Sequence, residues 1–179
     1  EPFCLVVYHP ESFSDVREEE VFDAIFASIS IIGIRNVVVM WPNADMHNSV
    51  LARRLRVILE NDLYRNLNIR AFKGFDPLDY VAVMHWAKLA IGNSSSFLRE
   101  GSRIGLPSVV LGERQRTREY GNNVVFSGSS SGSIITSFNK LPDKTLLAVD
   151  YTYGRGGSGK KIARSLTDIP LTKSEGLTI

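Results

Sequence analysis

The stretch Ile91-Gly-Asn-Ser-Ser-Ser-Phe-Leu-Arg-Glu-Gly101 decides the fold class of this chain. The apolar run Leu89–Ile91 has the pattern of a short buried strand, which Gly92 and Asn93 end. Three serines follow, and serine is a favoured residue at the start of a helix, here predicted over residues 96–104. A strand that leads through a small polar turn into a helix is the repeating unit of an open α/β sheet.

The rest of the chain continues this alternation of apolar strands and amphipathic helices. We predict strands at residues 3–8, 36–40, 69–72, 89–91, 108–111 and 123–126, and helices at residues 17–32, 49–60, 77–86, 96–104, 117–120 and 160–166. The Gly/Ser-rich run 127–133 is interpreted as a flexible loop before a further short helix. The order favours an α/β fold with a Rossmann-like, doubly wound parallel sheet over residues 1–166, followed by a tail over residues 167–179.

The serine turn has the features of an anion-binding site. The first turn of a helix leaves backbone N–H groups without intrahelical partners, and the helix dipole adds partial positive charge there. An anion above Ser94, Ser95 and Ser96 would meet amides and hydroxyls together, and a diphosphate suits such a site. Arg99 and Glu100 follow within two turns, and a carboxylate there can accept hydrogen bonds from ribose hydroxyls. The alternative is that the serines only cap the helix.

Further candidates follow other predicted strands, and ligands of open α/β sheets bind beyond the carboxyl ends of the strands. His9 follows the first strand and is the best catalytic candidate. Asn43 follows the second strand. Lys73 and Phe75 follow the third, where backbone groups could read the edge of a base while an aromatic ring stacks on it.

The segment Gly112-Glu-Arg-Gln-Arg-Thr-Arg-Glu-Tyr-Gly-Asn-Asn-Val124 packs several arginines and carboxylates beyond a predicted strand. Arg114 and Arg118 are the candidate partners of a diphosphate, because guanidinium groups bind phosphate oxygens in pairs. A merely solvated helix face is the alternative interpretation of this charge density. We interpret the arginines at 53, 54 and 56 in that way, as a solvated helix face.

These motifs together resemble the C-terminal, UDP-binding half of the UDP-N-acetylglucosamine 2-epimerases over about residues 5–166. The likeness rests on the motifs Asn-Ser-Ser-Ser-x-x-Arg-Glu, Gly-x-Arg-Gln-x-x-Arg-Glu-x-Gly-x-Asn-Val, Tyr-His-Pro at 8–10, Trp-Pro-Asn-Ala-Asp at 41–45, Phe-Asp-Pro-Leu-Asp-Tyr at 75–80 and Tyr-Gly-x-Gly at 153–156. The Asn-Ser-Ser form is similar to the hydrolysing branch. The resemblance implies one half of a two-domain GT-B fold.

By this resemblance the reaction is elimination of UDP from UDP-N-acetylglucosamine, followed by addition of water to release N-acetylmannosamine. The resemblance implies that His9 assists the departing UDP, the serines and arginines hold the diphosphate, and Glu100 anchors the ribose. No residue is assigned as the base that removes the C2 proton. Two alternatives stay open: a non-hydrolysing 2-epimerase, and a non-catalytic nucleotide-sugar-binding or interaction module.

Length and composition set the remaining expectations. A chain of 179 residues is one ordinary domain, and it begins at Glu1 with a strand, so we expect a missing N-terminal domain of the same enzyme as a partner, and a homodimer. A net charge of +2 argues against nucleic acid, and no apolar run is long enough for a membrane span. The single cysteine suits a reducing cytoplasm, and the scattered histidines predict no metal or other cofactor.

One glycine-rich motif resembles a phosphate-binding loop but does not complete its pattern. Residues 154–160 match the start of a phosphate-binding P-loop, but Lys161 stands where a P-loop has the Ser or Thr that holds magnesium. We therefore interpret this glycine-rich segment as the turn before the closing helix.

Overall fold

The computed structural model describes residues 1–11, 17–42 and 48–169. Its strands are β1 (Phe3–Val7), β2 (Asn36–Met40), β3 (Asn68–Phe72), β4 (Leu89–Gly92), β5 (Ser108–Leu111) and β6 (Val124–Ser127). Its α-helices are α1 (Glu18–Ile32), α2 (Asn48–Glu60), α3 (Pro77–Trp86), α4 (Arg99–Ile104), α5 (Ser131–Phe138) and α6 (Ser158–Asp168), with 3-10 turns η1 (Ser95–Phe97) and η2 (Lys144–Leu146).

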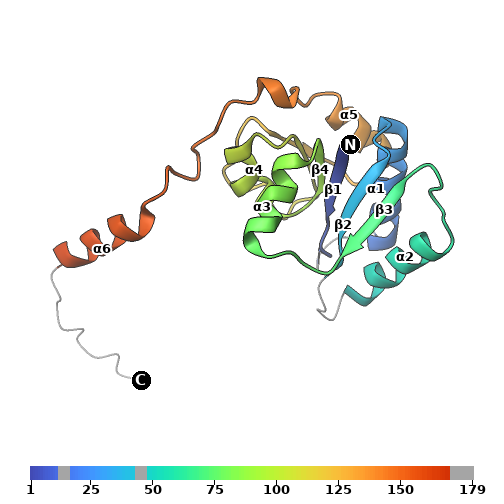
Figure 1. The fold of residues 1–179 in the computed structure, drawn as a ribbon, viewed down its shortest axis with the longest axis horizontal. Coiled ribbons are helices and arrows are strands. Elements are labelled where there is room, and N and C mark those ends of the chain that lie inside the picture. Colours follow the sequence, from blue (N-terminus) through green and yellow to red (C-terminus); the bar gives the residue numbers. More distant parts are fainter. Residues whose placement is uncertain (12–16, 43–47, 170–179) are drawn as a thin grey trace.

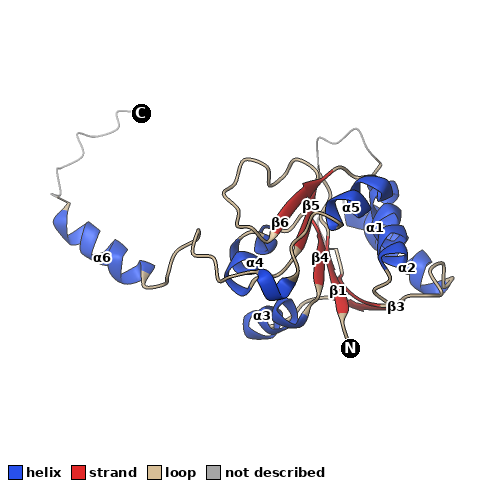
Figure 2. Ribbon diagram, turned by 90° about the horizontal axis from the view of Figure 1, so that it is seen from above, coloured by secondary structure: helices blue, strands red, loops and turns tan. Residues whose placement is uncertain are grey.

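The six strands form one parallel sheet in the order β3-β2-β1-β4-β5-β6, which is the doubly wound order. Helices α1, α2 and α5 cover one face and α3 and α4 cover the other (Figures 1 and 2). Two clusters of buried apolar side chains fill these layers, one on each face of the sheet. The predicted α/β fold is confirmed, since continuous β-branched runs such as Val37–Val39 form strands buried between helices.

Three predictions of local structure were wrong in detail. Residues 117–120 form no helix; the connection from β5 to β6 is a series of turns. The run 127–133 is mostly regular, because β6 extends to Ser127 and Ser130 caps α5, its side chain accepting the backbone N–H of Ser133 at 3.2 Å. The helix predicted over residues 96–104 is divided into η1 and α4.

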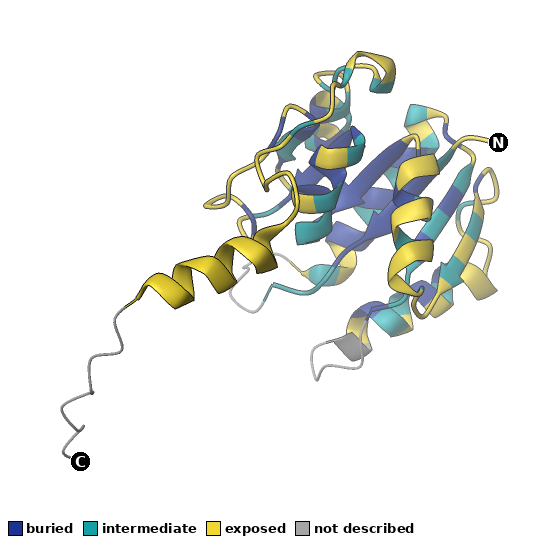
Figure 3. Ribbon diagram, turned by 60° about the vertical axis from the view of Figure 1, so that its left-hand side comes forward, coloured by how far each residue is buried: buried dark blue, intermediate teal, exposed yellow. Residues whose placement is uncertain are grey.

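Helix α6 stands away from the sheet, and each of its residues is exposed (Figures 1 and 3). Its apolar side chains Ile162, Leu166 and Ile169, the last just after the helix, are spaced to lie along one face. No strand leads directly into the glycine-rich turn at 154–157, since residues 128–153 contain none, so the P-loop interpretation is rejected on structural grounds as well. None of the helices in the described ranges is long and apolar enough to cross a membrane.

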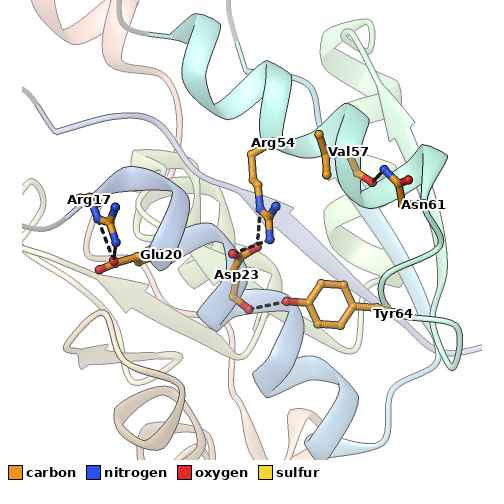
Figure 4. A network of polar contacts seen from close by, with 7 residues as sticks. All are labelled: Arg17, Glu20, Asp23, Arg54, Val57, Asn61 and Tyr64. Carbon is orange, nitrogen blue, oxygen red and sulfur yellow. Dashed lines mark hydrogen bonds and ion pairs between the residues drawn. The ribbon is translucent and has the colours of Figure 1, made fainter.

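A polar network joins α1 to α2 (Figure 4). Arg54 binds both carboxylate oxygens of Asp23, at 2.8 Å and 2.7 Å, and the Tyr64 hydroxyl donates to the backbone carbonyl of Asp23 at 3.1 Å. Arg56 lies over the ring of Trp41, 5.7 Å from its centre. The interpretation of the arginine cluster as a solvated face was therefore wrong for Arg54, which binds a specific partner and is only 28% exposed.

We predict that Arg54→Lys lowers the free energy of unfolding by about 1 kcal/mol, because lysine cannot make the two parallel hydrogen bonds that the guanidinium makes. Urea denaturation measures the change, and Arg53→Lys, at an exposed position of the same helix, is the matched control. Equal effects of the two substitutions would contradict a specific role for the Asp23 pair.

The sheet contains one position that tolerates only glycine. Gly92 has a φ of +145°, and a Cβ there would lie 1.9 Å from the carbonyl oxygen of Val7 on the neighbouring strand. The backbones of β1 and β4 can approach this closely only because no side chain separates them.

We predict that Gly92→Ala destabilises the fold by about 3 kcal/mol or more, since the clash is with the backbone and the buried strands cannot move apart cheaply. Chemical denaturation followed by circular dichroism gives the value. Gly74→Ala is the control, because no atom lies within 4 Å of the Cβ position there, and a comparable loss in that variant would refute the explanation.

Candidate functional site

The site is built where β1 and β4 lie side by side at the switch point of the sheet. Asn93 follows β4, is fully buried, and pairs with the backbone of His9 after β1. Its Oδ1 accepts the His9 backbone N–H at 2.8 Å, and its Nδ2 donates to the His9 carbonyl at 2.7 Å. The half-buried His9, the predicted catalytic residue, is thus fixed at the carboxyl edge of the sheet, where ligands of this fold class bind.

The three serines form a tight turn with ordered hydroxyls. The Ser94 side chain accepts the backbone N–H of Ser96 at 3.3 Å, which makes Ser94 the N-cap of η1. The Ser94 and Ser96 hydroxyls lie 2.8 Å apart, and the Tyr80 hydroxyl from α3 lies 2.8 Å from that of Ser96. All three serines are half-buried, so backbone and side-chain donors gather at one edge.

The division of the predicted helix at Leu98 changes the electrostatic argument for this turn. Only the three residues of η1 and the six of α4 are helical, so no long helix dipole points at the serines. Any anion above Ser94, Ser95 and Ser96 would be held by local N–H groups and hydroxyls. Asn123 anchors the end of this turn, because its buried Nδ2 donates to the carbonyls of Phe97 at 3.0 Å and Leu106 at 2.8 Å.

Arg99 and Glu100 lie in the first turn of α4, with Arg99 exposed and Glu100 half-buried. Both line a pocket of about 440 Å³ whose opposite wall is the segment 153–156 that leads to α6. Arg103 and Arg155 lie over the ring of Tyr151, 4.4 Å and 4.1 Å from its centre. The pocket therefore has room for a small polar ligand beside Glu100, and Arg99, Arg103 and Arg155 are among the residues that line it.

The loop after β5 presents the two predicted arginines around a buried anchor. Gln115 is 2% exposed and its Nε2 donates to the Asn93 carbonyl at 2.9 Å. Arg114 and Arg118 are exposed, on either side of Gln115 in the sequence. Gln115 lies in the turn at residues 114–117, and its contact with Asn93 holds this turn against the end of β4.

The remaining predicted contacts lie further along the sheet edge. Lys73 is exposed, and Phe75 is half-buried with its ring 4.9 Å from that of Phe72. Within the described part of the chain, no hydrogen bond joins Lys73 or Phe75 to the serine turn. Asn43 lies outside the described residues. Lys73 and Phe75 follow β3, which lies on the side of β1 opposite to β4.

Sequence reasoning missed an acidic cluster next to His9. The Glu11 backbone N–H donates to a carboxylate oxygen of Glu18 at 2.8 Å, and a Glu11 carboxylate oxygen accepts from Asn93 Nδ2 at 3.3 Å. Burial, with a hydrogen bond to Glu18, raises the pKa of Tyr8 well above its usual range. A Cβ on Gly112 would lie 2.4 Å from Glu11 Oε1, so that loop approaches Glu11 closely. The only sequence signal was the position of Glu11 just after a strand.

No metal centre is evident in the part of the chain that the structure describes, where no three His, Cys, Asp or Glu side chains gather in a way that could hold an ion.

Comparison with known proteins decides the family. The sequence profile described as UDP-N-acetylglucosamine 2-epimerase matches residues 1–167. The chain belongs to the UDP-N-acetylglucosamine 2-epimerase family. The family match covers each of the motifs on which the resemblance in sequence rested, from the His-Pro pair to the Tyr-Gly turn.

Two similar proteins are identical to the chain at about a quarter of the aligned positions. It is 26% identical over 149 residues to the polysialic acid biosynthesis protein P7 of Escherichia coli, covering 82% of the chain and 37% of that protein. It is 23% identical over 171 residues to the UDP-N,N'-diacetylbacillosamine 2-epimerase (hydrolyzing) of Legionella pneumophila, covering 94% of the chain and 43% of that protein. The chain thus spans less than half the length of these relatives.

Solved structures of 2-epimerases have the same fold. The UDP-GlcNAc 2-epimerase of Neisseria meningitidis bound to UDP-GlcNAc superposes with a TM-score of 0.70 at 18% identity, over 94% of this chain and 45% of that one. The enzyme of Methanocaldococcus jannaschii in complex with UDP-GlcNAc and UDP gives 0.68 at 20% identity, over the same shares. The fold is therefore the Rossmann-like, doubly wound fold of one half of a GT-B protein.

We predict that Asn93→Ala lowers the free energy of unfolding by about 2–4 kcal/mol, because it removes the two hydrogen bonds from a fully buried side chain to the His9 backbone and leaves a cavity in its place. Urea denaturation measures the loss, and proton exchange of the His9 amide should accelerate. Asn122→Ala, at an exposed position, is the control. A decrease in the free energy of unfolding of less than about 0.5 kcal/mol in the Asn93 variant would contradict a role for Asn93 in fixing the His9 backbone.

Proposed function

We propose that this chain is the UDP-binding half of a UDP-N-acetylglucosamine 2-epimerase of the hydrolysing type. The observation that carries the proposal is the serine turn at the switch point of the sheet, in a chain that belongs to this family. Its amides and hydroxyls are suited to a diphosphate, and Glu100 lines an adjacent pocket large enough for a ribose. Neutral donors fixed in advance stabilise a leaving diphosphate without reorganising during the reaction.

In the proposed reaction the C1–O bond of the nucleotide sugar breaks and UDP leaves as the C2 proton is removed, which gives a glycal-like intermediate. Water then adds across the double bond, and the free sugar departs with inverted configuration at C2. His9 lies beside the diphosphate and donates a proton or hydrogen bond to it, while Arg114 and Arg118 reach it from the β5–β6 connection. Lys73 and Phe75, with Asn43, form the base-binding end of the site.

The hydrolysing outcome is supported by the Asn-Ser-Ser sequence with Arg99-Glu100, and by the relative in Legionella pneumophila whose name includes that activity. Retention of the sugar on UDP, as in a non-hydrolysing 2-epimerase, is the competing outcome. Incubation of the full-length protein with UDP-N-acetylglucosamine distinguishes them, because the hydrolysing enzyme releases free N-acetylmannosamine and UDP, whereas the other forms UDP-N-acetylmannosamine.

The rest of the enzyme is the proposed partner of α6. The apolar side chains of this segment are Ile162, Leu166 and Ile169, which are 59%, 63% and 56% exposed. The N-terminal domain that completes the cleft would cover this apolar face of α6. A homodimer of such two-domain subunits is the proposed assembly.

We predict that the chain binds UDP in calorimetric titration and does not bind ATP. Glu100→Ala and Arg114→Ala should each weaken UDP binding about tenfold or more, since each removes a charge-assisted hydrogen bond worth about 1.5–3 kcal/mol. Arg53→Ala on the exposed side of α2 is the control. Wild-type affinity in both site variants would refute the assignment of these residues, and binding of neither nucleotide would count against the UDP-binding half.

A further inference from the structure

Tyr80 reaches the serine turn from a different element, and neither the family match nor the predicted site assigns it a role. Its hydroxyl lies 2.8 Å from Ser96 Oγ, which in turn lies 2.8 Å from Ser94 Oγ. The backbone N–H of Ser96 also donates to Ser94 Oγ, at 3.3 Å. Three hydroxyls therefore form a continuous chain that begins on α3 and ends at the first serine of the turn.

The hydrogen-bond donors in this series of three hydroxyls can be counted. If Tyr80 donates to Ser96 and Ser96 donates to Ser94, the Ser94 oxygen accepts two hydrogen bonds, one from the Ser96 hydroxyl and one from the Ser96 amide. Both of its lone pairs are then used, so its remaining capacity is to donate its own proton. In the reverse direction the Ser94 proton is used within the chain, and the Tyr80 proton is turned away from the serines.

Two features favour the direction that starts at Tyr80. Tyr80 is a phenol, which donates a hydrogen bond more readily than the aliphatic hydroxyl of a serine does, and burial, which raises its pKa, keeps it in the protonated form that can donate. An anion next to Ser94 would also favour that direction, because it needs a donor at that end. Aligned hydroxyls polarise one another, which makes the terminal donor stronger than an isolated serine.

We propose that Tyr80 is a positioning residue for the diphosphate: through Ser96 it orients the Ser94 hydroxyl as a hydrogen-bond donor to the phosphate oxygens. This inference rests on the proposed UDP-binding function and adds to it a residue that does not itself contact the ligand. It also gives the turn its selectivity, since a Ser94 oxygen with both lone pairs occupied accepts no donor from a neutral ligand.

The tyrosine ring holds this arrangement in place. Tyr80 is half-buried and packs against the apolar cluster on the α3–α4 face of the sheet, which also contains the fully buried Phe97 and Leu98 on either side of the end of η1. The same layer therefore fixes the ring that donates and the turn that accepts, so the hydroxyl chain is formed before any ligand arrives.

The test is Tyr80→Phe, which keeps the ring and removes the hydroxyl. We expect UDP affinity to fall about five- to tenfold, the effect of one hydrogen bond, whereas uridine affinity stays within twofold because uridine has no diphosphate. Tyr64→Phe, which removes a hydroxyl that donates to the Asp23 backbone, is the matched control and should leave both affinities unchanged. A role in packing alone would not change the ratio of UDP to uridine affinity.

A double-mutant cycle with Ser96→Ala completes the test. If Tyr80 acts through Ser96, Tyr80→Phe has no further effect on UDP affinity once Ser96 is alanine, whereas independent additive losses would overturn the relay. If Tyr80→Phe does not fold, as judged by its melting curve, Tyr80→Leu, which also lacks the hydroxyl, replaces it in the same cycle: a loss for UDP but not uridine that disappears once Ser96 is alanine supports the inference, and no loss overturns it. Unchanged UDP binding in Tyr80→Phe overturns the inference alone, whereas a wild-type chain that does not bind UDP overturns the proposed function with it.

Discussion

The buried amide of Asn93 is the constraint on which the arrangement of the site depends. Its side chain holds the backbone of His9 by two hydrogen bonds, and its own carbonyl receives the side chain of Gln115. One residue thereby fixes the relative positions of the loops after β1, β4 and β5. Gly92, one residue earlier, permits this closeness, because the strands could not lie side by side at this point with any larger residue.

The charges around this amide are mixed in sign. Glu11, Glu18 and Glu100 lie at the same edge as the exposed arginines, and the net charge of the whole chain is only +2. A diphosphate would therefore gain little from long-range attraction, and its binding would depend on short-range contacts, those of the proposed arginines and those of neutral donors held in place by the fold. The serine turn supplies such donors, and the buried Asn123 and Gln115 keep the surrounding backbone in place.

The sequence predicted the sheet well and the polar connections poorly. The strand over residues 36–40 and the helix over 77–86 agree to the residue with β2 and α3, because a β-branched run and an N-terminal proline are strong local signals. The helix expected over 117–120 is absent, and the turn before it is held by Gln115 against Asn93, a contact between positions 22 residues apart that no local pattern contains. Ser130 was assigned to a loop although it caps α5, since glycine and serine composition does not distinguish a cap from a linker. Tyr80 and Glu11 could not be found, because their roles arise only when separate elements meet in space.

Helix α6 gives the end of the chain a different character from the rest. It has eleven residues, all of them exposed, and helices of this length have marginal stability in water without tertiary packing. In the proposed enzyme, the free energy that keeps it helical would come from the surface that covers its apolar face. Folding of this last segment and assembly with the proposed partner would then be one thermodynamic event, and the helical content of residues 158–168 would measure how completely the protein is assembled.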